Sequence, residues 1–110
     1  MGRPAGLREA FQRFVKAARR CGPVTVYAQK TRIVLQHRVR FAGVVVRKNF
    51  LDAGLWLKRR VDHPRLRKVE SFGILGYGLH FRVERPGDID RAMVQLIREA
   101  YVTHRSRFRS

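Results

Sequence analysis

The sequence is poor in cysteine and in long apolar runs. Cys21 is the single cysteine, so no internal disulfide can form, and one cysteine with four scattered histidines makes no zinc site. The apolar runs, such as Ala42 to Val46, are far too short to cross a membrane. The first residues also lack the apolar stretch of a secretory signal. We therefore expect a cytoplasmic protein with no metal, no cofactor and no membrane span.

Acidic residues are the other scarcity. The chain has 8 of them against 25 basic residues, a formal net charge of +17 at pH 7, and twenty of the basic residues are arginine. A folded chain of this size exposes roughly 6,000 Å², which leaves about one excess positive charge per 350 Å². Such a surface binds something anionic. GC-rich coding bias is the competing explanation for so much arginine, so composition alone leaves a functional face and a generically basic surface both open.

Catalytic motifs are also missing. The sequence has no Gly-rich phosphate loop, and its glycines at 73, 76 and 78 do not form a dinucleotide fingerprint. Asp62 and His63 are the one acid–histidine neighbour pair, but adjacent residues do not make a dyad without the right geometry. We expect a protein that is not an enzyme; an enzyme would have to use Asp62 and His63.

The length of 110 residues and the apolar content of 45% are typical of one globular domain. We expect a single domain over residues 1–110, with a core from about residue 7 to 104 and a basic tail at 105–110. Apolar periodicity predicts helices at 7–20 and 89–104, strands at 24–27, 32–35, 41–46, 51–57 and 79–83, and an irregular segment at 58–78. Asp88 is the expected N-cap of the second helix.

These elements predict an α+β fold, an antiparallel sheet of about five strands with the N- and C-terminal helices packed on one face. The strand at 41–46 is apolar at successive positions, which predicts cover on both of its faces. The expected core consists of Phe11, Phe14, Phe41, Val45, Leu55, Phe81, Met93, Leu96, Ile97 and Tyr101.

A basic cluster lies in the irregular segment, and arginine suits phosphate because its planar fork donates two hydrogen bonds. The candidate anion-binding residues there are Lys58, Arg59, Arg60, His63, Arg65, Arg67 and Lys68, with Arg32, Arg38 and Arg40 extending the footprint. Trp56 falls on the strand face opposite Leu55 and Leu57, where an exposed ring could stack on a base. The alternative for Trp56 is packing under the long loop.

The sequence resembles a family of small bacterial domains of unknown function, some labelled "predicted transport protein". The resemblance spans Leu7 to Tyr101 and is carried by Cys21-Gly22-Pro23-Val24, Gln29-Lys30-Thr31-Arg32-Ile33, Arg40-Phe41-Ala42, Leu55-Trp56-Leu57, Arg59-Arg60-Val61-Asp62-His63-Pro64-Arg65, Asp88-Ile89-Asp90 and Glu99-Ala100-Tyr101. It implies a compact α+β domain without established catalytic residues. The apolar, glycine-rich stretch Phe72 to Tyr77 departs from the family pattern.

Taken together, the sequence predicts a non-enzymatic binding module for an anionic partner, with nucleic acid as the leading candidate. The alternative is a protein-interaction or accessory domain whose acidic protein partner neutralises the same residues.

Overall fold

The computed structural model describes residues 5–37 and 39–107. The elements are, in chain order, α1 (Ala5–Arg19), β1 (Thr25–Gln29), β2 (Arg32–His37), β3 (Val39–Val46), β4 (Leu51–Leu57), β5 (Leu66–Ser71), β6 (Tyr77–Val83) and α2 (Arg91–Arg107). Two 3₁₀ turns, η1 (Gly73–Leu75) and η2 (Pro86–Asp88), flank β6. The predicted α+β class is confirmed, with six strands instead of about five.

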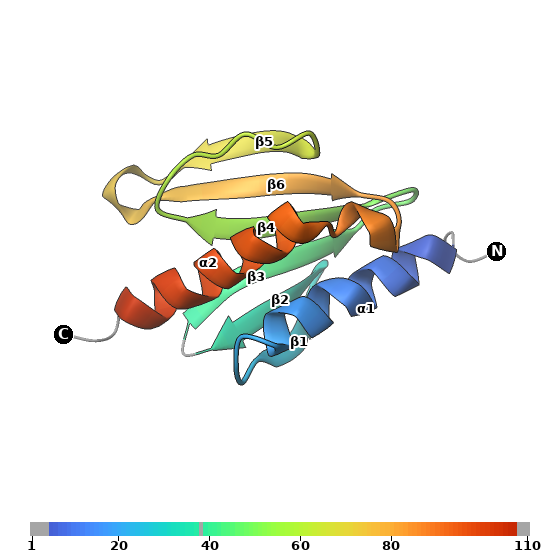
Figure 1. The fold of residues 1–110 in the computed structure, drawn as a ribbon, viewed down its shortest axis with the longest axis horizontal. Helices are drawn as coiled ribbons and strands as arrows, with labels where there is room; N and C mark the ends of the chain where they lie inside the picture. Colours follow the sequence, from blue (N-terminus) through green and yellow to red (C-terminus); the bar gives the residue numbers. More distant parts are fainter. Residues whose placement is uncertain (1–4, 38, 108–110) are drawn as a thin grey trace.

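The six strands form one antiparallel sheet in the order β1-β2-β3-β4-β6-β5. Figure 1 shows α1 and α2 lying side by side on the same face of this sheet, as predicted. Within the described ranges, neither helix has the length and apolar character needed to cross a membrane.

The core lies between the helices and the sheet. Alternate residues of β4 and β6 point to this layer, and α1 contributes residues spaced three and four apart. Of the predicted core, Phe11 and Val45 are only half-buried, and the other eight residues are buried. Val45 was wrongly placed because it pairs with Asp52 and belongs to the opposite face of the sheet.

Strand β3 is covered on one face only, which corrects the prediction that both of its faces are covered. Phe41 contacts Tyr101 of α2 at a ring-centroid distance of 5.3 Å, on the helix side. Gly43 and Val45 line a hollow on the other side, over which the described chain places no helix. The sequence therefore carries an apolar strand face that the described chain leaves open, which is typical of an interaction surface.

The missed strand, β5, lies inside the segment that was predicted to be irregular. It is an edge strand, paired with β6 alone, and its pairing is interrupted between Leu66 and Lys68. Edge strands commonly carry charged residues and bulges that discourage pairing with other chains. These features hide the apolar alternation by which a strand is recognised.

The start of α2 also differs from the prediction. Asp90, rather than Asp88, caps the helix, because its Oδ1 accepts the Met93 backbone N–H at 2.8 Å. Asp88 is buried in η2, where its carboxylate accepts the backbone N–H of Glu84 at 2.8 Å. The helix continues to Arg107, past the predicted end at residue 104, and residues 108–110 of the predicted tail lie outside the described residues.

Candidate functional site

The sheet face opposite the helices has a strip of glycines in its centre. Direct strand pairing aligns one residue from each strand, in spatial order Tyr27, Val34, Gly43, Gly54, His80 and Lys68. Val34 and His80 are three strand spacings apart, roughly 14 Å, and only the two glycines lie between them. Gly78, opposite Trp56, extends the strip along β6, where the Phe72 ring covers it.

This glycine floor forms a hollow of about 310 Å³ in the open face. Pockets for small molecules begin at about this size, roughly 300 Å³. The apolar part of the wall includes Val34, Val45, Trp56 and Phe72, and the polar part consists of Arg32, Arg40, Asp52, Glu70 and His80. The hollow therefore combines a flat floor, aromatic walls and charged groups of both signs.

His80 is held between two carboxylates at one side of the hollow. Its Nε2 lies 2.7 Å from Glu70 Oε1, and its Nδ1 lies 3.3 Å from the buried Asp52 Oδ1. Asp52 also accepts a hydrogen bond from Arg67 at 3.1 Å through its second oxygen. These contacts hold the His80 ring in place and bring ionisable side chains of β4, β5 and β6 together.

Glu70 shows the electrostatic effect of this arrangement. Its hydrogen bond with His80 holds the pKa of the Glu70 carboxyl below its ordinary value, against the opposing effect of desolvation. The positive charges of Lys68 and Arg32 act in the same direction as the hydrogen bond. Arg32 therefore acts electrostatically across the hollow on a carboxylate of β5.

Trp56 both packs against the long loop and lines the open face, the two alternatives that the sequence left open. Its indole N–H donates to the Leu75 carbonyl oxygen at 3.0 Å, so the ring is tied to the loop between β5 and β6. Phe72 packs beside it at a centroid distance of 5.5 Å. Both rings line the hollow, and Trp56 therefore forms a fixed wall while remaining half-buried.

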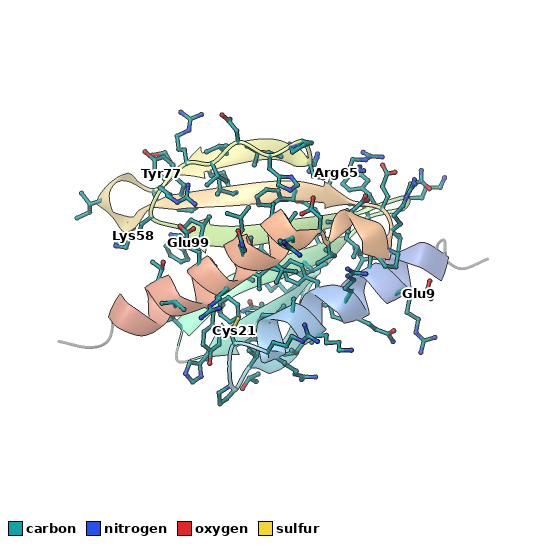
Figure 2. The ribbon with its side chains drawn as sticks, viewed as in Figure 1. Glu9, Cys21, Lys58, Arg65, Tyr77 and Glu99 are labelled. Atoms are coloured by element: carbon teal, nitrogen blue, oxygen red, sulfur yellow. The ribbon has the colours of Figure 1, made fainter. Side chains whose placement is uncertain are left out.

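The predicted basic set is divided between the two sides of the sheet. Three members line the hollow on the open face, namely Arg32, Arg40 and Trp56. Arg67 joins this face through its ion pair with Asp52, and Lys68 through its strand pairing with His80. Arg59 instead donates two hydrogen bonds to Glu99 of α2, at 2.9 and 2.8 Å. Arg65 pairs with Asp88 at 2.8 Å, and Figure 2 shows Lys58 and Arg65 near opposite ends of the sheet.

The other predicted anion-binding residues do not lie together in one cluster. Lys58 and Arg60 are exposed, and Arg38 lies outside the described residues. His63 is buried beneath the segment, with Nδ1 accepting the Arg65 backbone N–H at 3.0 Å and Nε2 facing Asp90 at 3.5 Å. Asp62 is exposed and no hydrogen bond joins it to His63 in the described chain, so this pair does not form a catalytic dyad.

Most of the excess positive charge lies in the first half of the chain. Residues 1–50 hold 12 of the 25 basic residues but only one of the eight acidic residues, Glu9. Six of the seven acidic residues in the second half are paired with basic side chains or histidines of that half, namely Asp52, Glu70, Glu84, Asp88, Asp90 and Glu99. Four basic residues of α1 and the one that follows it make no ion pair with a described residue, namely Arg8, Arg13, Lys16, Arg19 and Arg20.

Sequence reasoning missed the Asp52–His80–Glu70 cluster and the glycine floor. The cluster joins three strands through the register β4-β6-β5, and one of these strands was not predicted. The available signal was weak, because Asp52 and His80 occupy polar positions of alternating strands and the glycines were assigned to turns or left without a role.

Comparison with known proteins adds one finding. The family model described as "Domain of unknown function (DUF5655)" matches residues 1–104. No curated protein and no solved structure shows a significant match to the chain. Because the match covers nearly the entire sequence, the chain belongs to the DUF5655 family of domains of unknown function.

Proposed function

We propose that this protein is a nucleic-acid-binding module that contacts phosphates on the open face of the sheet. The observation that carries the proposal is an uncovered sheet face with a preformed hollow, placed beside a half of the chain whose positive charge is not compensated. Polyanions bind such a surface by releasing counterions. Arginine at the rim supplies bidentate donors for phosphate oxygens.

Arg32 and Arg40 are the contacts that we assign to phosphate. Both line the hollow from the cationic half of the molecule. Arg40 donates to Gln29 Oε1 at 3.2 Å, and neither arginine forms an ion pair with a described acidic residue. By contrast, Arg59, Arg65 and Arg67 are already matched with carboxylates. A phosphate would have to compete with those carboxylates, whereas at Arg32 and Arg40 it would meet no ion-paired carboxylate, only the longer-range charge of Glu70 on Arg32.

The test is the salt dependence of binding to a labelled single-stranded oligonucleotide, measured by fluorescence anisotropy. Replacing Arg32 and Arg40 by Ala should make the slope of log K against log salt shallower by about 1.4 units, since each phosphate contact on a single strand contributes about 0.7. Affinity should fall by a similar factor for every sequence, because phosphate contacts carry no sequence information.

Two double variants provide matched controls, because each also removes two positive charges. Lys16→Ala with Arg19→Ala alters α1 on the other side of the sheet, and Arg59→Ala with Arg60→Ala alters the ion-paired segment. Both should change the slope by less than the Arg32 and Arg40 pair. Equal effects of all three pairs would indicate a generically basic surface. Binding to polyglutamate but to no oligonucleotide would favour the accessory domain with an acidic protein partner.

A further inference from the structure

We propose that the hollow in the open face receives an unpaired nucleobase, so that the nucleic acid is single-stranded where it crosses the sheet. This inference rests on the proposed function and names the form of the partner. It follows from the shape of the floor, the position of the aromatic rings and the location of the charged groups.

The floor has the shape that a flat ring requires. Gly43 and Gly54 face each other across β3 and β4 and carry no side chain of their own, while the His80 ring and the Arg32 chain border them. A nucleobase is planar, so it can lie against exposed backbone that a side chain would hold away. A base within a duplex is stacked and paired on both sides, and it cannot reach such a floor without leaving the helix.

The aromatic wall is already held in position. The Trp56 indole donates a hydrogen bond to the Leu75 carbonyl oxygen, and the Phe72 ring packs against the indole at an interplanar angle of 59°. The loop that carries Phe72 ends at Gly76, whose φ of 110° suits glycine, and a Cβ there would collide with the Leu57 carbonyl. A rigid aromatic wall loses little conformational entropy on stacking with a base.

The charged groups are divided in a way that fits a nucleotide. Arg32 and Arg40 stand at the rim on the β2–β3 side, where the sugar–phosphate backbone would pass. Glu70, His80 and Asp52 lie on the β4–β6–β5 side and make that part of the hollow polar, where the edge of a base would lie. A polyanion without bases would gain nothing from the carboxylates, so their presence favours a ligand that has a polar, uncharged edge.

Trp56 is the only tryptophan in the chain, so its fluorescence reports on the wall of the hollow directly. The experiment compares three probes of equal length, namely single-stranded poly-dT, an abasic strand with the same phosphates, and a duplex. We expect quenching by the single strand with an affinity about ten-fold above that of the abasic strand, as the stacking of one base provides. The duplex should cause little quenching.

Filling the hollow tests the site without altering charge. A Cβ at Gly54 would meet the Gly43 carbonyl oxygen at 3.6 Å and the His80 ring at 3.7 Å, which is ordinary van der Waals contact. Gly54→Val should abolish the preference for the single strand over the abasic strand, while the salt slope stays unchanged. Gly87→Val is the control, since no atom lies within 4 Å of a Cβ at that position in η2. Thermal unfolding of each variant verifies that it is folded.

The outcomes separate this inference from the proposed function. Equal binding and equal quenching by the abasic strand would overturn the base site while leaving phosphate binding intact. The absence of binding to all three probes would overturn both proposals. Quenching by a mononucleotide, or by phosphatidylglycerol vesicles through the exposed Ile74 of the neighbouring loop, without any response to poly-dT would likewise overturn both.

Discussion

The hydroxyl of Tyr101 donates a hydrogen bond of 3.1 Å to the carbonyl oxygen of Pro23, which lies 78 residues earlier in the chain. This contact ties α2 to the turn that connects α1 with the sheet. The Tyr101 ring also stacks on His37 with an interplanar angle of 9° and meets the edge of Phe41. One buried side chain of α2 therefore contacts both the turn after α1 and strands β2 and β3 of the sheet.

The turn beside this contact should tolerate only glycine. Gly22 has a φ of 146°, and a Cβ there would press against the Tyr101 hydroxyl. Gly22→Ala should lower the free energy of unfolding by about 1–3 kcal/mol, as backbone strain and the collision add. Urea denaturation measures this loss. Tyr101→Phe should cost only about 1 kcal/mol, the value of one hydrogen bond, and a Gly22→Ala protein as stable as the wild type would contradict the structure.

Packing of α1 on the sheet depends on Phe14, which is 1% exposed. Phe14→Ala should lower the free energy of unfolding by roughly 3–5 kcal/mol, because the truncation removes apolar contacts and leaves a cavity. Val102→Ala on α2 is the comparison, since Val102 is 44% exposed and should change stability little. Similar denaturation midpoints for the two variants would rule out the observed packing of α1.

Asp90 should stabilise α2 in a pH-dependent way. Its hydrogen bond with the Met93 backbone N–H is the largest cause that lowers the pKa of Asp90 from its ordinary value of 3.8. The contribution to stability is therefore present above pH 4 and is lost as the pH falls through the lower pKa of the folded state. Asp90→Ala should cost about 1 kcal/mol at pH 7, and the difference from the wild type should shrink in acid. A difference that is constant with pH would argue against capping by this carboxylate.

His80 should control the ionisation of Glu70. In His80→Ala, the pKa of the Glu70 carboxyl should rise toward its ordinary value, because the hydrogen bond that lowers it most is absent. Carboxyl NMR titration measures this change. Glu84 is an internal reference, as its pKa is lowered chiefly by Arg82 and should not move. An unchanged Glu70 pKa would mean that the His80–Glu70 contact does not persist in solution.

Local sequence patterns predicted most elements of the fold, because the core of α1, β4 and α2 follows helical or alternating periodicity. They failed where a residue's position depends on distant pairing. The sequence pattern predicts Val45 to be a core residue, but its pairing with Asp52 places it on the open face. The pattern likewise predicts Asp88 to be a helix cap, but its carboxylate instead binds Arg65 and the Glu84 backbone N–H.

The candidate site was less predictable for the same reason. Trp56 and Arg32 were identified from the residue types and the strand pattern, and both line the hollow. The floor requires that Gly43 pairs with Gly54, and no local signal indicates that register. The pairing of Arg59 with Glu99 joins segments 40 residues apart, so a run of basic residues in the sequence did not reveal that part of its charge is neutralised.

The uneven distribution of acidic residues also gives the protein a charge dipole. Residues 1–50 form α1 and the β1–β3 side of the sheet, and almost all of the acidic residues lie on the other side. In the field of a polyanion such a molecule rotates before contact, so that its cationic side arrives first. Orientation of this kind raises the association rate constant and leaves the dissociation rate constant nearly unchanged. The speed of encounter would then depend on α1, even though α1 lies on the face away from the hollow.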